Sequence, residues 1–393
     1  MRMGGKAWII AILIVVGSIC LAYSEADTQA EMRYIRQMVG KDASQRAIVW
    51  QSEAVDNSAV AQYRRQGDER ASVVRPRIER CEAGDTIFFR YRADIAALPV
   101  DTACEYRVVS HSYQSEWRRL SAKKEEYTAV IFADSQCVSD YRTWAELVQA
   151  ARERERDASL CLHLGDLVDC GASQYQWERW LMGAEEMLAE CAFAPTMGNH
   201  EDYGIDWQMS LPHYYRALFP VVSAGDDMLD GHVYSFDYGD VHYAVLDTQA
   251  EELAEWKADW TAHQAEWLAR DLAESGARWK VVLCHKPFYE IDGTMSEHGR
   301  AWLPICRRYG VQLVLSGHHH IYSREKTGNI TMITAGVSGD GTGYEPQKRQ
   351  EIVALRCDTP NYLTMKVTDD TLHVRALQLD GTIIDETMIQ HCQ

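Results

Sequence analysis

The sequence predicts a layered α/β protein preceded by a small antiparallel β domain, and three observations support this fold class. From residue 127 onward, short apolar runs alternate with segments whose apolar residues recur at helical spacing. Between residues 46 and 120, strand-like segments rich in β-branched and aromatic residues follow one another with turn signals between them. The chain has 393 residues, of which 46% are hydrophobic and 25% charged, a globular composition long enough for two domains.

The amino terminus has the pattern of a targeting segment. Arg2 and Lys6 precede residues 7–23, which carry no charge and are followed by small residues. A helix of that length falls slightly short of a hydrocarbon core of about 30 Å. We therefore interpret residues 1–26 as a signal peptide, with an uncleaved membrane anchor as the alternative. Either one predicts a secreted or membrane-anchored, extracytoplasmic protein that touches a membrane only through this segment.

The next two regions are a predicted linker and a predicted β domain. Residues 27–45 are polar and are expected to be the linker, and residues 46–122 are expected to form a small β sandwich. Its strands are expected at residues 46–54, 86–93 and 104–110. Because export to an oxidising compartment permits disulfides, Cys81 could pair with Cys104.

Residues 127–393 are predicted to form the α/β core. Continuous apolar runs are typical of strands that are covered on both faces. Strands of this kind are expected within residues 129–134, 160–166, 193–200, 280–287 and 311–320, where an apolar stretch ends in polar residues, and helices are expected over residues 141–156 and around 297–309.

The net charge argues against nucleic acid as a partner. The chain has 58 acidic and 40 basic residues, which gives a net charge of −18. A surface this acidic repels a phosphate backbone. A small phosphorylated substrate can be held only where metal cations locally reverse the field.

Polar side chains follow the apolar runs, at the points where the strands are expected to end. They are Asp134, Asp166, Asn199, His200, His285, His318 and His320. Asp166 follows Asp134 by 32 residues and precedes Asn199 by 33, and 33 residues also separate His285 from His318. About 30 residues are typical of one strand-helix-strand unit, so these side chains are expected at one edge of the sheet, where open α/β sheets bind ligands. Cys137 and Cys170 share that edge and could also pair.

Two Asp, one Asn and three His form a mixed oxygen and nitrogen set that suits Fe, Mn or Zn. Six ligands exceed what one tetrahedral ion needs. A pair of ions about 3.5–4 Å apart that share one carboxylate uses all six and generates a hydroxide for in-line attack on phosphorus. Each residue taken singly has an ordinary structural explanation, such as a helix N-cap or a turn. Their common order and domain-scale spacing favour two divalent or trivalent metal ions.

The segments that carry these residues resemble the five sequence blocks of the calcineurin-like metallophosphoesterase superfamily. They are FADSQ (132–136), GDLVD (165–169), GNHE (198–201), CHKP (284–287) and GHHH (317–320). The preceding β region resembles the amino-terminal, fibronectin- or immunoglobulin-like domain of purple acid phosphatases. The resemblance spans about residues 46 to 390 and implies a two-sheet β sandwich flanked by helices, with a dimetal site on one rim.

The resemblance also implies a role for each residue. The implied ligands are Asp134 and His320 for the first metal, Asn199, His285 and His318 for the second, and Asp166 as a bridge between them. His200 resembles the family histidine that contacts the phosphoryl group or protonates the leaving oxygen. The alternative role of His200 is a hydrogen bond that orients Asn199 or a carboxylate.

Two positions depart from the family pattern. Purple acid phosphatases have a tyrosine three residues after the bridging Asp, and here that residue is Asp169. Without a phenolate ligand the protein is not expected to be purple. Other members have a histidine two residues after the first Asp, and here that residue is Gln136. Whether Gln136 or Asp169 completes the first metal site stays open at this point, and weaker binding of the first metal is a possible consequence.

The expected function is that of a dimetal phosphohydrolase that cleaves phosphomonoesters by attack of a metal-bound hydroxide, with His200 assisting departure of the leaving group. A phosphodiesterase or nucleotidase is the alternative, because the same metals can serve it. A surface binding protein on an inactive phosphatase scaffold ranks third, because all six ligands are present. Tyr203, Trp207, His213 and Tyr214 could line a pocket, although aromatic residues at such spacing more often pack in a core.

Overall fold

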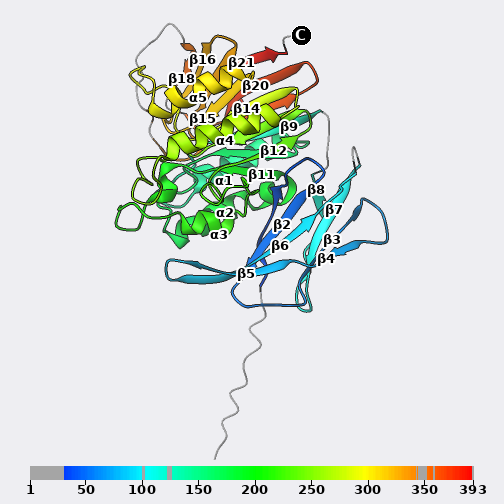
Figure 1. Cartoon of the computed structure of the whole chain (residues 1–393). Helices are drawn as coiled ribbons and strands as arrows, with labels where there is room; N and C mark the ends of the chain where they lie inside the picture. The colour runs from blue at the N-terminus through cyan, green and yellow to red at the C-terminus, as the bar shows by residue number, and fades with distance from the viewer. Residues whose placement is uncertain are drawn as a thin grey trace, which may run out of the picture.

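The computed structural model describes residues 31–99, 102–121, 126–341, 343, 352–356 and 359–391. It shows a mixed α/β protein built from three sheets and a few helices, which confirms the predicted fold class (Figure 1). The expected signal peptide or anchor, residues 1–26, lies outside the described residues. In the part of the chain that is described, none of the helices combines the length and the apolar character that crossing a membrane requires.

The largest sheet has ten strands in the order β21-β20-β19-β9-β10-β11-β1-β2-β6-β5. Their bounds are β1 (Arg33–Val39), β2 (Arg46–Ser52), β5 (Arg77–Ala83), β6 (Thr86–Ile95), β9 (Tyr127–Phe132), β10 (Leu160–Leu164), β11 (Ala192–Thr196), β19 (Asn361–Val367), β20 (Thr371–Gln378) and β21 (Ile383–Gln390). The strands β9, β10 and β11 are parallel to one another, as expected for strands joined by helical crossovers.

The second sheet has seven strands in the order β12-β13-β14-β15-β17-β16-β18, and the third has four in the order β4-β3-β7-β8. The bounds in the second sheet are β12 (Tyr234–Tyr238), β13 (Val241–Val245), β14 (Trp279–Leu283), β15 (Leu313–Ser316), β16 (Tyr322–Thr327), β17 (Ile330–Ala335) and β18 (Ile352–Arg356). Those in the third are β3 (Val60–Arg65), β4 (Ser72–Val74), β7 (Cys104–Val109) and β8 (Arg118–Leu120).

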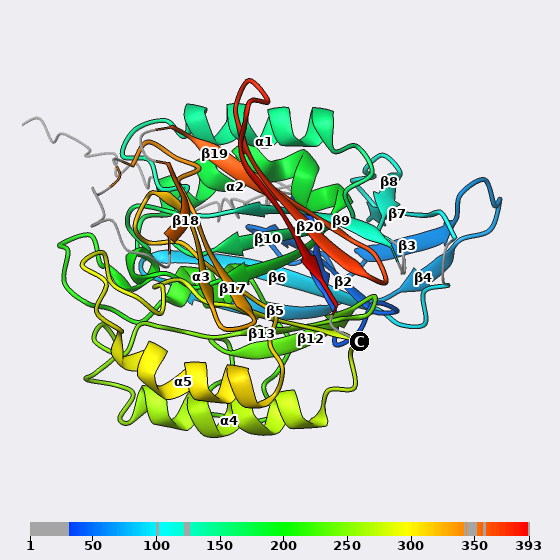
Figure 2. The same cartoon turned by 90° about the horizontal axis from the view of Figure 1, so that it is seen from above.

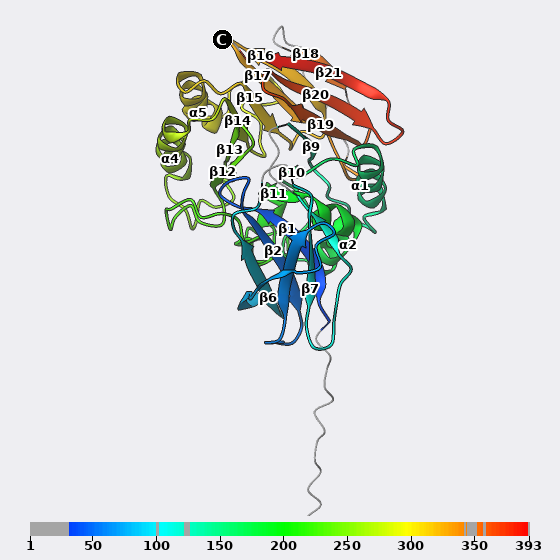
Figure 3. The ribbon, with the colours of Figure 1, turned by 90° about the vertical axis from the view of Figure 1, so that its right-hand side faces the viewer.

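The ten-stranded and seven-stranded sheets pack face to face and enclose the main core. Ile131 and Leu162 of the first sheet and Val281 and Leu315 of the second are fully buried in one apolar cluster. Helices cover the outer faces, so each strand in the middle is shielded on both sides and reads as a continuous apolar run (Figure 3).

The long helices lie in two groups on opposite sides of this sandwich, as the view from above shows (Figure 2). On the side of the ten-stranded sheet lie α1 (Arg142–Arg154), α2 (Gln174–Glu190) and the short α3 (His213–Leu218). On the side of the seven-stranded sheet lie α4 (Trp260–Glu274) and α5 (Glu297–Arg308).

The expectation of a linker over residues 27–45 is wrong, because this range contains β1. The strand lies between β11 and β2, with Gln37 opposite Ala192 of β11, and so joins the amino-terminal strands to the main sheet. Its polar residues suggested a linker, but the side chains of Arg36 and Gln37 are buried and hydrogen-bonded. Gln37 Nε2 donates to the backbone carbonyls of Ala189 at 2.6 Å and Arg119 at 2.8 Å. The satisfied amide lets a polar residue occupy a buried strand.

The amino-terminal part of the chain forms its own small core. The strands expected at residues 46–54, 86–93 and 104–110 are present as β2, β6 and β7. The four-stranded sheet packs on β1, β2 and β6, where Trp50, Tyr91 and Tyr106 are buried. The Trp50 and Tyr91 rings stack with their centroids 5.2 Å apart.

The proposed disulfides are not present, because all eight described cysteines are free. Cys81 belongs to the core under α2 and α3, whereas Cys104 belongs to the core of the amino-terminal sheets. Cys137 and Cys170 are each within 3.5 Å of a different backbone carbonyl, those of Ser135 and Tyr203. These thiols are buried residues of the cores rather than cross-links.

Candidate metal centre

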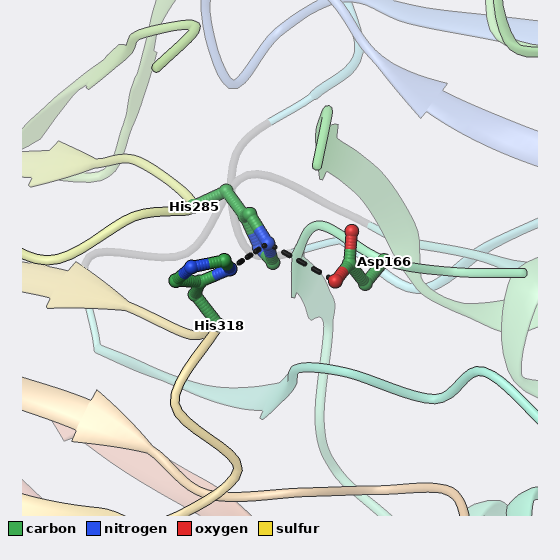
Figure 4. Close-up of side chains that lie close together, drawn as sticks. All are labelled: Asp166, His285 and His318. Atoms are coloured by element: carbon green, nitrogen blue, oxygen red, sulfur yellow. Dashed lines mark hydrogen bonds and ion pairs between the residues drawn. The ribbon is translucent and has the colours of Figure 1, made fainter. Parts of the chain in front are cut away.

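The loops that follow β9, β10, β11, β14 and β15 bring the candidate ligands together. Asp166, His285 and His318 form one group whose ligand atoms all lie within 4.8 Å of one another (Figure 4). Asp134, Asp166 and His320 form a second group of the same kind. Asp166 belongs to both groups, which is the arrangement that a carboxylate bridging two ions requires.

The first of these groups is centred on His285. Its Nε2 lies 3.2 Å from Asp166 Oδ2, 3.1 Å from Asn199 Oδ1 and 3.3 Å from His318 Nδ1. Its Nδ1 lies 2.8 Å from the backbone carbonyl of Leu164, to which it donates. That hydrogen bond assigns the proton to Nδ1 and leaves the Nε2 lone pair facing the other three ligand atoms.

The second group is assembled around Asp134, and Gln136 lies beside it. His320 Nε2 lies 3.6 Å from Asp134 Oδ1. The Gln136 amide is buried, and in the orientation in which its nitrogen donates to the backbone carbonyls of Asp134 and Asp166 its oxygen lies 2.9 Å from His320 Nε2. The Asp169 carboxylate, in contrast, lies 3.7 Å from His200 Nδ1 and is in neither group. Of the two departures from the family pattern, Gln136 is therefore the one that lies beside the first-metal residues.

The backbone at the candidate ligands adopts a conformation that few residues tolerate. Asp134, Asp166, His318 and His320 all have positive φ, at 51°, 52°, 73° and 53°. Left-handed φ is uncommon for residues other than glycine and clusters at functional sites. Four such residues in one place indicate that the loops are shaped to aim these side chains at a common point.

The glycines before these residues are required by close packing. A Cβ on Gly198 would clash with the Asp166 carboxylate, and one on Gly317 would clash with the Asp134 carboxylate. The motifs GNH and GHH therefore need glycine, because the carboxylate of a candidate ligand from another loop occupies the space that a Cβ would fill.

Glu201 is a site residue whose role the sequence analysis did not identify. Its carboxylate is buried and accepts four backbone N–H groups, those of Asp166 at 2.9 Å, Leu167 at 2.9 Å, Val168 at 3.3 Å and Gly198 at 2.8 Å. These donors lie in the two loops that carry Asp166 and Asn199, so Glu201 joins the loops. The available signal was its place at the end of the GNHE block.

His200 lies at the edge of the centre and is accessible to solvent, with 21% of its side chain exposed. Its Nδ1 is 2.6 Å from the backbone carbonyl of Asp169, which assigns the proton to Nδ1. Its Nε2 is left 3.9 Å from Asp166 Oδ2, facing the centre. A ring held in this way presents one nitrogen to a molecule bound next to the candidate ligands.

The electrostatics of the centre suit cations. Burial and the neighbouring Asp166 raise the pKa of Asp134. Burial would raise the pKa of Asp166 too, but His285, His200 and His318 outweigh it and lower that pKa. Burial and the neighbouring His285 lower the pKa of His318 to about 2. The imidazole is therefore neutral at ordinary pH, which is the form that binds a metal.

The residues present fit a pair of metal ions. The two buried carboxylates of Asp134 and Asp166 have ligand atoms within 4.8 Å of one another, and the remaining candidate donors are imidazole nitrogens and amide oxygens. Bound cations would compensate for the negative charge of these buried carboxylates. Its mixture of oxygen and nitrogen donors is compatible with Fe, Mn or Zn.

The aromatic residues singled out after GNHE divide into two pairs. Tyr214 is buried and donates to Thr86 Oγ1 at 2.6 Å, and His213 begins α3, so neither lies in the ligand groups. Tyr203 and Trp207 lie next to the centre, because both rings contact the ring of His200. The Tyr203 hydroxyl also accepts from Asn199 Nδ2 at 3.2 Å.

Comparison with known proteins agrees with this geometry. The family model of the calcineurin-like phosphoesterases matches residues 127–322. Purple acid phosphatase 18 of Arabidopsis thaliana is 25% identical over 174 residues, 42% of this chain and 38% of that protein. Purple acid phosphatase 15 of the same plant is 28% identical over 188 residues, 44% of this chain and 33% of that protein. The matched region thus spans little more than a third of these relatives.

The fold comparison extends over nearly the whole chain. Purple acid phosphatase PPD1 from yellow lupin (Lupinus luteus) seeds superposes with a TM-score of 0.78 over 92% of this chain and 74% of that chain, at 16% sequence identity. The amino-terminal strands are thus part of the shared fold. Residues 127–322 of this protein therefore belong to the calcineurin-like phosphoesterase family, within a chain that has the fold of a purple acid phosphatase.

Proposed function

We propose that this protein is a metal-dependent phosphoric ester hydrolase that uses two metal ions to cleave phosphomonoesters. The observation that carries the proposal is the sharing of Asp166 between two groups of ligand atoms. Asp134 and His320 would hold the first ion, and Asn199, His285 and His318 the second. When bound, the ions would lower the pKa of water to supply a nucleophile and would offset the charge of the phosphoryl oxygens.

Side chains of the protein would hold the ions and would bind the phosphoryl group or transfer a proton. The Leu164 carbonyl fixes the ring orientation of His285, and burial keeps His318 in the neutral form that can bind a metal. His200 is held by the Asp169 carbonyl with its Nε2 directed at the centre, so it can bind a phosphoryl oxygen or give a proton to the leaving oxygen. This placement supports the catalytic role over a purely orienting one, because the side chain of His200 makes its close hydrogen bond to a backbone carbonyl rather than to Asn199.

Gln136 is proposed as a further ligand of the first ion. Its amide oxygen lies beside His320, whereas Asp169 turns toward His200. A neutral amide is a weaker ligand than a phenolate, so we expect the first ion to bind less tightly than the second. Inductively coupled plasma analysis during stepwise chelation tests this, and loss of both ions in a single step contradicts it.

A panel of monoesters and diesters tests the reaction. We expect the purified protein with Mn, Fe or Zn to hydrolyse phosphomonoesters, and Asp166→Asn to abolish the activity because the shared carboxylate is lost. Asp369→Asn, an exposed change far along the chain, is the matched control and should retain full activity. Exclusive cleavage of diesters would favour a phosphodiesterase. Absence of hydrolysis in protein that binds two ions would favour a binding role on an inactive scaffold.

Export is part of the proposal, on the strength of the uncharged segment behind Arg2 and Lys6. Fractionation of producing cells, followed by amino-terminal sequencing, tests it. A mature protein that begins near residue 27 outside the cytoplasm supports a cleaved signal peptide. Full-length protein in the membrane fraction supports an anchor, and full-length protein in the cytoplasm refutes export.

A further inference from the structure

Trp207 is the most conspicuous residue near the candidate centre that the proposed mechanism does not use. Its side chain is exposed, with 55% of its surface accessible, although tryptophan is among the most apolar residues. Its φ is 62°, which is a genuine outlier for a bulky residue. Both features cost free energy, so a structural role in a core does not explain this residue.

The loop around Trp207 is well held. Gly204 N–H donates to the Gln208 carbonyl at 2.8 Å, and Trp207 N–H donates to the Gly204 carbonyl at 2.9 Å. Ser210 N–H closes the loop by donating to the Asp202 carbonyl at 2.8 Å. The exposed ring is therefore presented from a hydrogen-bonded hairpin.

The ring of Trp207 extends an aromatic group that begins at the candidate acid. The centroids of His200 and Trp207 are 6.3 Å apart with the rings at 88°, and those of Tyr203 and Trp207 are 5.8 Å apart. His200 and Tyr203 are 5.1 Å apart. Tyr203 in turn accepts from Asn199, so the same group reaches a candidate metal ligand.

The position of Trp207 next to His200 indicates which part of a bound substrate would contact the Trp207 ring. If His200 faces the leaving oxygen, the substituent on that oxygen extends from His200 toward solvent, past the neighbouring rings. Ile205 and Met209 of the same loop are also exposed, so Trp207 has apolar neighbours at the surface. A planar aromatic substituent gains stacking energy on such a surface, whereas a small polar one does not.

We propose that Trp207 is a specificity-determining residue that stacks against the leaving group, and that it makes the enzyme prefer phosphomonoesters of aromatic alcohols. The proposal rests on the phosphomonoesterase function proposed above. It names a feature of the substrate, a planar ring directly attached to the ester oxygen, and assigns its recognition to one residue.

Hydrolysis of phenyl, cyclohexyl and glycerol phosphates by the wild type and by Trp207→Ala tests the proposal. Comparing each substrate between the two proteins cancels its intrinsic reactivity. We expect kcat/KM for phenyl phosphate to fall about threefold to tenfold in Trp207→Ala, the range of one aromatic contact, with little change for glycerol phosphate and a smaller loss for cyclohexyl phosphate. Trp207→Phe should keep most of the preference.

Two further measurements separate the possible outcomes. Trp256→Ala, which removes another exposed tryptophan, is the matched control and should leave all three rates unchanged. Calorimetry with phenylphosphonate and methylphosphonate tests binding without hydrolysis. Equal losses for phenyl and glycerol phosphates, or for phenyl and cyclohexyl phosphates, overturn the role of Trp207. A wild type that hydrolyses none of the three but binds phenylphosphonate through Trp207 overturns the proposed function alone.

Discussion

Replacing Glu201 by glutamine is the sharpest test of how the centre is built. Each carboxylate oxygen accepts two backbone N–H groups, Oε1 those of Leu167 and Val168 and Oε2 those of Asp166 and Gly198. In glutamine one oxygen becomes an amino group, which cannot accept and which faces two N–H donors. Two hydrogen bonds to a buried charged acceptor are lost, each of about 1.5–3 kcal/mol.

We therefore expect Glu201→Gln to lower the free energy of unfolding by about 3–6 kcal/mol. The two loops joined by Glu201 carry Asp166 and Asn199, so affinity for metal should fall by about tenfold to a hundredfold, as for other groups that orient ligands. Urea denaturation of metal-free protein measures the first effect, and competition with a metal-binding dye measures the second.

A control keeps this test specific. Glu146 is exposed on α1, and Glu146→Gln should change the free energy of unfolding by less than about 0.5 kcal/mol. A loss below about 1 kcal/mol in Glu201→Gln, together with unchanged metal affinity, would contradict the role of Glu201 as the group that joins the two loops. It would mean that the loops hold their shape without the carboxylate.

Three further predictions concern the metals, the pH dependence and β1. Metal analysis should find two ions per chain at saturation, and the iron-loaded protein should lack a purple absorption band because Asp169 replaces the tyrosine. Burial lowers the pKa of His242, but hydrogen bonds to Asp237 at 2.7 Å and Asp271 at 2.8 Å raise it to about 9. The hydrogen bonds of protonated His242 to these two carboxylates should stabilise the fold by about 3 kcal/mol below pH 6.5. This stabilisation should be lost as the pH rises through 9. Gln37→Leu should cost about 2–4 kcal/mol, because it leaves buried backbone groups without partners.

A specific experimental result would contradict each of these three predictions. One ion per chain at saturation would disprove the two-metal proposal. Urea curves at pH 6, 8 and 10 should converge between wild type and His242→Gln as pH rises, and a difference that stays constant would exclude the titration. His373→Gln, which removes an ion pair with the more exposed Glu386, is the control. A Gln37→Leu protein as stable as wild type would show that the side-chain hydrogen bonds of Gln37 contribute little to stability.

Much of the fold was predictable because local pattern and tertiary environment agree. Strands covered on both faces are largely apolar, as within residues 129–134 and 160–166. They could therefore be recognised from their own sequence, without knowledge of the segments that pack against them. β1 was mistaken for a linker because the burial of Arg36 and Gln37 depends on partners more than 80 residues away. The local sequence around a residue contains no information about hydrogen-bond partners that are so distant in the chain.

The order of residues was enough to predict the candidate metal ligands, because each one closely follows a strand and parallel strands end at a common edge. The relative positions of these side chains became visible in the folded chain. The fold showed Asp166 shared by two groups, the left-handed backbone at four candidate ligands, Glu201 joining two loops, and Gln136 rather than Asp169 beside His320. It also showed that the eight cysteines among the described residues are unpaired and that Trp207 is exposed next to His200. These features depend on distances between segments far apart in the chain, which residue order does not encode locally.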